Sequence, residues 1–234
     1  MRSTERNYEL FVPPETDGKT PLPVVFVFHG KDGTGGDVRN AFALEAEAKG
    51  KAVFVYPDGL NRDWNYNDPA TRNDDVLLFD ALLEKLSNDV CIDRARVFAA
   101  GFSNGGYFAN HLGCRRGGAL RAVASHSGGG PTGASIEIDD RGNLTCPEAP
   151  VAALIVHGID DTNVKLEEAK KSVAHWNRVN GCRSGTSPFG PPPCAMLAGC
   201  AKGREIVTCE VPSLGHSIWP GDGARVTWQF FETF

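Results

Sequence analysis

The sequence lacks long hydrophobic runs and an excess of basic residues. No apolar stretch in its 234 residues approaches the length that spans a bilayer, so we expect no membrane partner. Lysine and arginine total 24 against 29 aspartates and glutamates, and they are scattered along the chain. The basic stripe typical of nucleic-acid-binding proteins is therefore missing, and we expect no nucleic-acid partner.

Zinc-ligand spacing is also missing. None of the seven cysteines forms a pair separated by two to four residues, and no acidic pair has a further ligand at metal-binding spacing. We expect no metal and no cofactor, and this many cysteines favours disulfides in a secreted protein. Residues 1–9 are polar, so we interpret the chain as a mature domain without its signal peptide.

Short apolar runs alternate with longer amphipathic stretches along the chain. This pattern predicts the α/β class, with a mostly parallel twisted sheet between two layers of helices and one domain over residues 1–234. The expected strands are Tyr8–Val12 as an antiparallel edge, Val24–His29, Val53–Tyr56, Val97–Ala100, Ala122–Ser125, Val151–His157 and Glu205–Val211. The expected helices are Asp37–Lys49, Asn73–Asn88, Asn104–Leu112, Lys165–Val179 and Gly223–Phe231.

Two stretches do not follow this alternation, Gly128–Pro150 and the proline-rich Gly181–Gly203. Loops this long in a compact domain are usually functional or held by other contacts. Three of the seven cysteines lie in the second stretch, which predicts that disulfides hold it. Whether either stretch acts as a lid stays open.

The pattern G-x-S-x-G occurs at Gly101–Gly105, between an expected strand and an expected helix. A sharp turn there crowds the backbone on both sides of its apex, which requires the two glycines and raises the Ser103 side chain above the sheet. Ser103 would lie at the positive end of the helix that begins at Asn104. The alternative is an ordinary Gly-Ser turn, but this context favours a nucleophile.

A serine nucleophile needs a base and a carboxylate that orients the base. In such folds these partners follow the serine in the order acid, histidine, at the carboxyl ends of strands. Asp160 and Asp161 follow one expected strand, and His216 follows the last one. The remaining histidines are interpreted as structural; they are His29, His111, His126, His157 and His175.

The loop after Val24–His29 is expected to complete an oxyanion hole. Gly30 allows the backbone to turn its N–H groups toward the serine. We expect the backbone N–H groups of Lys31 and Asn104 to bind the oxyanion.

Five motifs are spread over the chain from Tyr8 onward. They are His29-Gly30, Tyr56-Pro57-Asp58-Gly59 followed by Trp64, the Gly101–Gly106 turn, His157-Gly158-x-x-Asp161-x-x-Val164, and Gly215-His216 followed by Trp219-Pro220-Gly221. Together they resemble the feruloyl esterase and polyhydroxybutyrate depolymerase group of α/β-hydrolases. In this respect the chain is similar to members of carbohydrate esterase family 1. The sequence departs from the pattern of this group by one additional residue between His216 and Trp219.

The resemblance implies the α/β-hydrolase fold with Ser103 as nucleophile, His216 as base and Asp161, not Asp160, as the acid. It indicates a secreted serine esterase that cleaves feruloyl esters of plant cell-wall polysaccharide. Three aromatic side chains are candidates for stacking against a phenolic ring or a sugar, and packing beneath a loop is the equally weighted alternative for each; they are Trp64, Tyr66 and Trp219. The short chain leaves little room for a cap domain.

Cysteine pairing is expected on two grounds. Cys91 precedes the strand that leads to Ser103 and Cys114 ends the helix that follows it, so a Cys91–Cys114 disulfide is our hypothesis. The resemblance implies a Cys182–Cys200 disulfide, which leaves Cys194–Cys209 as the third pair and Cys146 unpaired.

Alternative functions use the same scaffold. A polyhydroxybutyrate depolymerase or an acetylxylan esterase would need the same catalytic residues, because the fold does not select the substrate. A catalytically inactive carbohydrate-binding relative is disfavoured, since nucleophile, acid and base are all present in the expected order. We expect a monomer whose ligand is an ester attached to a polysaccharide.

Overall fold

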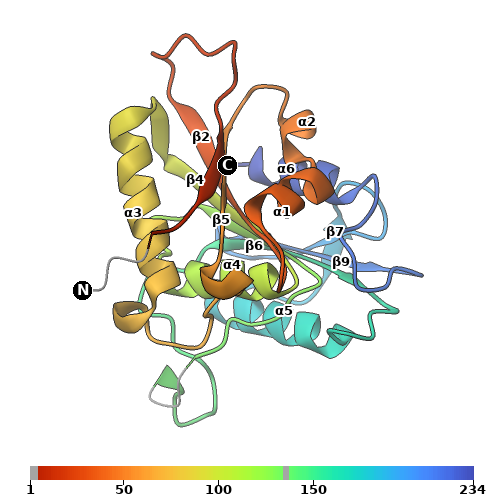
Figure 1. Ribbon diagram of the computed structural model, residues 1–234. Helices are drawn as coiled ribbons and strands as arrows, with labels where there is room; N and C mark the ends of the chain where they lie inside the picture. Colours follow the sequence, from red (N-terminus) through yellow and green to blue (C-terminus); the bar gives the residue numbers. More distant parts are fainter. Residues whose placement is uncertain (1–4, 134–136) are drawn as a thin grey trace.

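The computed structural model describes residues 5–133 and 137–234, and nine strands of these residues form one sheet (Figure 1). Its strand order is β1-β3-β2-β4-β5-β6-β9-β8-β7. The strands are β1 (Tyr8–Phe11), β2 (Leu22–Phe28), β3 (Val53–Pro57), β4 (Ile92–Phe102), β5 (Ala122–His126), β6 (Ala152–Gly158), β7 (Thr186–Pro188), β8 (Ala195–Leu197) and β9 (Ile206–Val211).

The central strands β3, β2, β4, β5, β6 and β9 run parallel, and antiparallel strands close both edges. The parallel strands are almost continuously apolar because both faces of the sheet are covered. Within β2, alternate side chains serve different layers: Val24 and Phe26 pack on one face, Val25 and Val27 on the other. The predicted α/β class and the antiparallel edge strand are confirmed.

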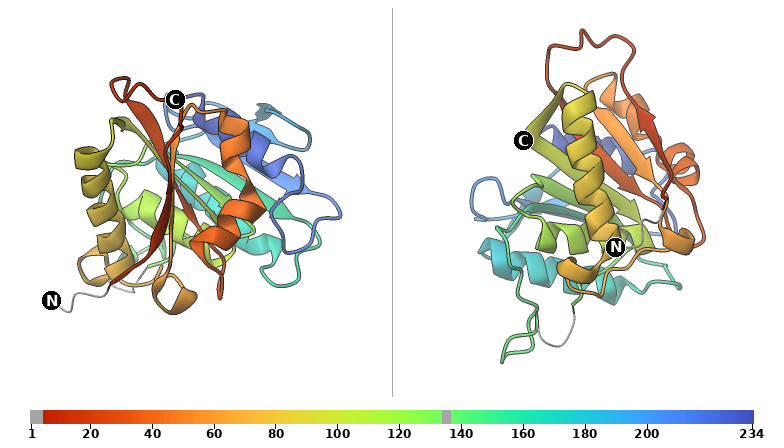
Figure 2. Two further views of the ribbon diagram at one scale, coloured as in Figure 1. Left: turned by 45° about the horizontal axis from the view of Figure 1, so that its top comes forward. Right: turned by 60° about the vertical axis from the view of Figure 1, so that its left-hand side comes forward.

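Helices form one layer on each face of the sheet (Figure 2). The helices α3, α4 and α5 pack on one face, and α1, α2 and α6 on the other. Their bounds are α1 (Gly35–Phe42), α2 (Leu44–Ala48), α3 (Asp74–Asp89), α4 (Asn104–Arg115), α5 (Leu166–Asn180) and α6 (Gly223–Phe231), with 3-10 turns η1 (Leu60–Arg62) and η2 (Ala70–Arg72). None of the helices in the described residues is long and apolar enough to cross a membrane.

The single helix expected over Asp37–Lys49 is two helices. Ala43 adopts a left-handed conformation with φ of 51°, which ends α1 and begins α2. Phe42 and Leu44 are both buried on the same face of the sheet, whereas a regular helix would turn residues two apart toward opposite sides. The break therefore allows both apolar side chains to enter one core.

The stretch Gly181–Gly203, expected as a loop, contains β7 and β8, which extend the sheet beyond β9. These strands have only three residues each, too few to show an alternating pattern. Cys182 is bonded to Cys200 and Cys194 to Cys209, so disulfides do hold this stretch.

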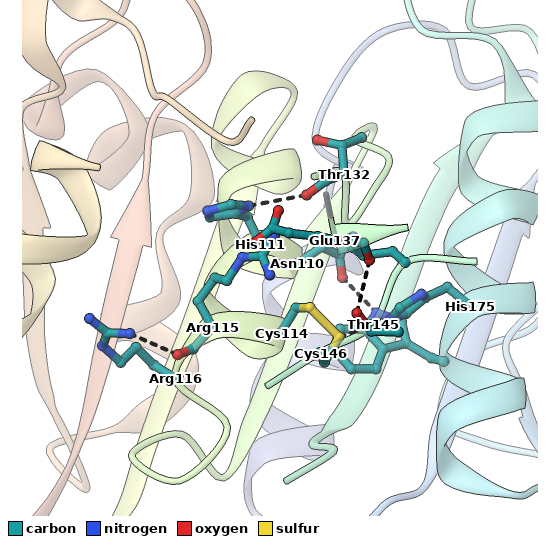
Figure 3. Close-up of a disulfide and its surroundings, with 12 residues drawn as sticks. Asn110, His111, Cys114, Arg115, Arg116, Thr132, Glu137, Thr145, Cys146 and His175 are labelled. Carbon is teal, nitrogen blue, oxygen red and sulfur yellow. Dashed lines mark hydrogen bonds and ion pairs between the residues drawn. A yellow bond between two sulfur atoms is a disulfide. The ribbon is translucent and has the colours of Figure 1, made fainter. Parts of the chain in front are cut away.

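The expected Cys91–Cys114 disulfide is wrong, and so is the expectation that Cys146 is unpaired. Cys114 lies on the buried side of α4 and is bonded to Cys146, beside His175 of α5 (Figure 3). Cys91 is free, and its thiol donates a hydrogen bond to the Lys19 carbonyl at 3.3 Å. Position along the sheet does not reveal this pairing, because Cys114 reaches the segment that packs against α5.

The Cys114–Cys146 disulfide also holds the other long stretch, Gly128–Pro150, against the helices. Asn110 of α4 donates to the Gly129 carbonyl at 2.9 Å, and Arg178 of α5 donates to the Leu144 carbonyl at 2.7 Å. Residues 134–136 of this stretch, like residues 1–4 at the start of the chain, lie outside the described residues.

Candidate active site

Ser103 lies at the turn between β4 and α4, with a backbone φ of 54° that is unusual for a residue with a side chain. The turn is possible because two backbone segments approach it closely. A Cβ at Gly101 would lie 2.1 Å from the Gly105 carbonyl oxygen, and a Cβ at Gly105 would lie 2.2 Å from the Phe28 carbonyl oxygen. Both glycines of the pattern are therefore required by packing.

A chain of hydrogen bonds joins the three predicted catalytic residues. Nε2 of His216 lies 2.8 Å from the Ser103 hydroxyl oxygen, and its Nδ1 lies 2.7 Å from Oδ2 of Asp161. Since a carboxylate only accepts, Nδ1 carries the proton and Nε2 can accept the proton of Ser103. This geometry is the arrangement that general-base activation of a serine requires.

Asp161 is buried and fixed by the loop that follows β6. Its Oδ1 accepts hydrogen bonds from the backbone N–H groups of Asn163 and Val164, each at 2.9 Å, which leaves Oδ2 directed at His216. His157 donates from Nε2 to the Val164 carbonyl at 2.8 Å and so stabilises the same loop. Asp160 is exposed, and His216 is hydrogen-bonded to its neighbour Asp161 instead.

The loop with the predicted oxyanion donor Lys31 lies against Ser103. A Cβ at Gly30 would lie 3.5 Å from Cβ of Ser103. The Lys31 backbone N–H donates to none of the described residues, and Asn104 is the first residue of α4, where backbone N–H groups have no partner within the helix. Both donors are thus available, and their role in binding an oxyanion remains a prediction.

His29 and the segment 59–64 hold this loop. The backbone N–H of Gly59 donates to Nε2 of His29 at 2.9 Å, and Nδ1 of His29 donates to the Gly30 carbonyl at 2.7 Å. The Asp32 N–H donates to the Arg62 carbonyl at 2.8 Å. Burial lowers the pKa of His29, which favours the neutral ring that this pattern of one donor and one acceptor needs.

Trp64 is not available for stacking on a substrate, which corrects its expected role. The side chain is only 3% exposed and packs against both Phe28 and Phe108. Its indole N–H donates to the His29 carbonyl at 3.0 Å, and its backbone N–H donates to Oδ1 of Asn104 at 2.9 Å. Trp64 thereby connects the two segments that carry the predicted oxyanion donors.

Replacement of Trp64 by phenylalanine is expected to lower kcat by about tenfold to 100-fold with little change in KM. The variant retains an aromatic ring in the core but loses the hydrogen bond to the His29 carbonyl, and small displacements of groups that stabilise a transition state are costly. Steady-state kinetics with methyl ferulate, beside a thermal melt, measure this effect. A rise in KM alone, with kcat unchanged, would contradict it.

The other two candidate aromatics are partly accessible. Tyr66 stacks on Tyr107 with ring centroids 4.9 Å apart, and burial raises the pKa of the Tyr66 hydroxyl. Trp219 follows His216 by three residues, and the two side chains line one hollow in the surface. Their roles in binding a substrate stay predictions.

Three further histidines lie outside the hydrogen-bond chain of Ser103, His216 and Asp161 and are held neutral; His111 and His126 are buried, and His175 is partly buried. Burial lowers the pKa of His126 to about 3 and those of His111 and His175 to about 4. His175 lies close to Cys114 and Cys146, a grouping that could suggest a metal site, but those two sulfur atoms are bonded to each other (Figure 3). A disulfide supplies no thiolate ligand.

Comparison with known proteins places the chain among esterases. No family model matches the sequence. Feruloyl esterase C of Emericella nidulans is 31% identical over 241 residues, which cover 97% of this chain and 83% of that protein. Acetyl xylan esterase from Aspergillus awamori superposes with a TM-score of 0.72 at 16% identity, covering 97% of this chain and 95% of the other. A ferulic acid esterase from Anaeromyces mucronatus, solved in complex with ferulic acid, gives 0.66 at 18% identity and covers 98% and 85%.

Proposed function

The chain belongs to the feruloyl esterase family of carboxylic ester hydrolases, and we propose that it hydrolyses feruloyl esters through Ser103, His216 and Asp161. The observation that carries the proposal is the continuous hydrogen-bond chain from Asp161 through His216 to the Ser103 hydroxyl. The α/β-hydrolase fold holds these residues on three loops at the carboxyl ends of β4, β6 and β9.

In the acylation step, Oγ of Ser103 attacks the ester carbonyl carbon while Nε2 of His216 takes the hydroxyl proton. The carbonyl oxygen becomes an oxyanion, which the backbone N–H groups of Lys31 and Asn104 stabilise. The bond from the carbonyl carbon to the alcohol oxygen then breaks, and His216 returns its proton to that oxygen. A feruloyl ester of Ser103 remains on the enzyme.

Deacylation repeats these steps with water. His216 removes a proton from the water, whose oxygen attacks the feruloyl carbonyl, and the bond to Oγ of Ser103 breaks. The proton passes from His216 to Ser103, so the free hydroxyl is restored and ferulic acid leaves. Throughout the cycle Asp161 holds the imidazole in one orientation and stabilises its charged form.

We further propose a secreted, monomeric catalytic domain, formed by residues 1–234, that acts on esters attached to polysaccharide. Three disulfides in the described residues support an oxidising compartment. The hollow beside His216 opens to solvent and is not covered by an inserted domain in the described residues, which suits an ester on a long polymer.

A panel of three substrates tests the proposed activity. We expect hydrolysis of methyl ferulate, detected as released ferulic acid, at a kcat/KM at least tenfold above that for acetylated xylan; polyhydroxybutyrate film should release no soluble product. Preferential release of acetate would instead identify an acetylxylan esterase, and erosion of the film would identify a depolymerase. Failure to hydrolyse even a small activated ester would support the inactive carbohydrate-binding alternative.

A further inference from the structure

A hollow of about 590 Å³ lies beside the predicted catalytic histidine. It is bounded by the loop from His216 to Gly221, by Phe102, and by the helices α1, α2 and α6, which lie together on one side of the sheet (Figure 1). The left-handed break at Ala43 forms part of its wall. The hollow therefore adjoins the nucleophile, since Phe102 directly precedes Ser103 in the chain.

The walls of this hollow are fixed before any ligand binds. The Ser127 hydroxyl donates to the Ser217 carbonyl at 3.0 Å, and the Gly223 N–H donates to the Trp219 carbonyl at 2.9 Å. The Phe102 and His216 rings contact each other with centroids 5.0 Å apart. A preformed site costs little ordering when a ligand enters it.

Proton transfer decides which half of the ester enters this hollow. In the proposed mechanism Nε2 of His216 must give its proton to the departing alcohol oxygen, so the alcohol half must lie on the side of His216. The hollow is lined by His216 and by five residues that follow it, and so lies on that side. The acyl half extends away from the same carbon in another direction.

The lining of the hollow suits a sugar ring. Trp219, Ile218 and Pro220 offer an apolar surface for the C–H face of a sugar, and the partly buried Glu47 lies in the wall on α2. The Glu47 carboxylate makes no hydrogen bond or ion pair with any described residue, so it is available to accept from sugar hydroxyls.

We propose that this hollow is the subsite for the sugar of the leaving group, with Trp219 as its stacking surface and Glu47 as its hydrogen-bond acceptor. The inference rests on the proposed function, because it assigns the alcohol half of the same ester. It separates the two halves of the substrate: the sugar binds beside His216 and the feruloyl group does not.

The test compares two esters that share the acyl group, methyl ferulate and 5-O-feruloyl arabinose. For Trp219→Ala we expect the ratio of kcat/KM for the sugar ester to that for the methyl ester to fall about fivefold to tenfold. Trp219→Phe keeps an aromatic face and should recover most of the ratio, and Glu47→Ala should lower it about threefold. Leu77→Ala, an exposed apolar deletion on α3, is the matched control and should leave the ratio unchanged.

Thermal melts establish that each variant is folded. If the ratio of kcat/KM for the sugar ester to that for the methyl ester stays constant in folded Trp219→Ala and Glu47→Ala, the assignment is overturned. An equal loss of activity on both esters is one such result, and it would indicate that the feruloyl group occupies the hollow. If the unaltered enzyme hydrolyses neither ester, the proposed function itself is overturned, and the subsite with it.

Discussion

Replacement of Ser103 by alanine is expected to lower kcat for methyl ferulate by about 10⁶-fold, to the limit of detection. The hydroxyl is the only nucleophile that the described residues place 2.8 Å from Nε2 of His216, and alanine has no atom that can form the ester intermediate. The oxyanion donors remain, so residual substrate binding should persist. Release of ferulic acid, followed by absorbance, measures the loss.

Ser213 provides a matched control for this variant. It is an exposed serine that also has a positive φ, of 59°, and it lies outside the hydrogen-bond chain. Ser213→Ala should retain kcat within about twofold. A folded Ser103→Ala variant that still hydrolyses methyl ferulate would contradict the proposed nucleophile, and equal losses in both variants would indicate a general effect on the loops.

Replacement of Asp161 by asparagine is expected to lower kcat by about 10⁴-fold without unfolding the protein. Oδ1 of Asp161 accepts from two backbone N–H groups, so the amide oxygen must occupy that position. The amide NH2 group then faces Nδ1 of His216 and forces the ring proton onto Nε2. With a proton on Nε2, His216 can no longer accept the proton of Ser103.

The neighbouring Asp160→Asn variant separates this effect from a change of local charge. Asp160 is exposed, and its side chain makes no hydrogen bond with the described residues. We expect kcat to stay within about twofold of the unaltered enzyme. A larger loss for Asp160→Asn than for Asp161→Asn would reverse the assignment of the acid.

The site could be predicted from the sequence where local chemistry dictates the residue. The turn at Ser103 needs glycine at Gly101 and Gly105 because backbone oxygens approach both positions, and this requirement is visible in the sequence. The loop of Asp161 is similar, because its carboxylate binds backbone groups two and three residues later. Such short-range requirements produce recognisable spacings.

Features that depend on distant packing could not be predicted in this way. Trp64 looks the same in sequence whether it binds a substrate or lies in the core, and only the contacts with Phe28 and Phe108 decide. The partner of Cys114 likewise depends on how Gly128–Pro150 folds against α5. The break at Ala43 lets Phe42 and Leu44 pack into the same core, which a helical periodicity does not reveal.

Trapping of the acyl-enzyme tests the central claim most directly. The enzyme is mixed with excess methyl ferulate, quenched in acid within the first turnovers, digested, and mapped by mass spectrometry. We predict a feruloyl group on the peptide that contains Ser103, attached to the Ser103 oxygen, and none in the Ser103→Ala variant. Release of ferulic acid accompanied by a feruloyl group on any other residue would contradict the proposed mechanism.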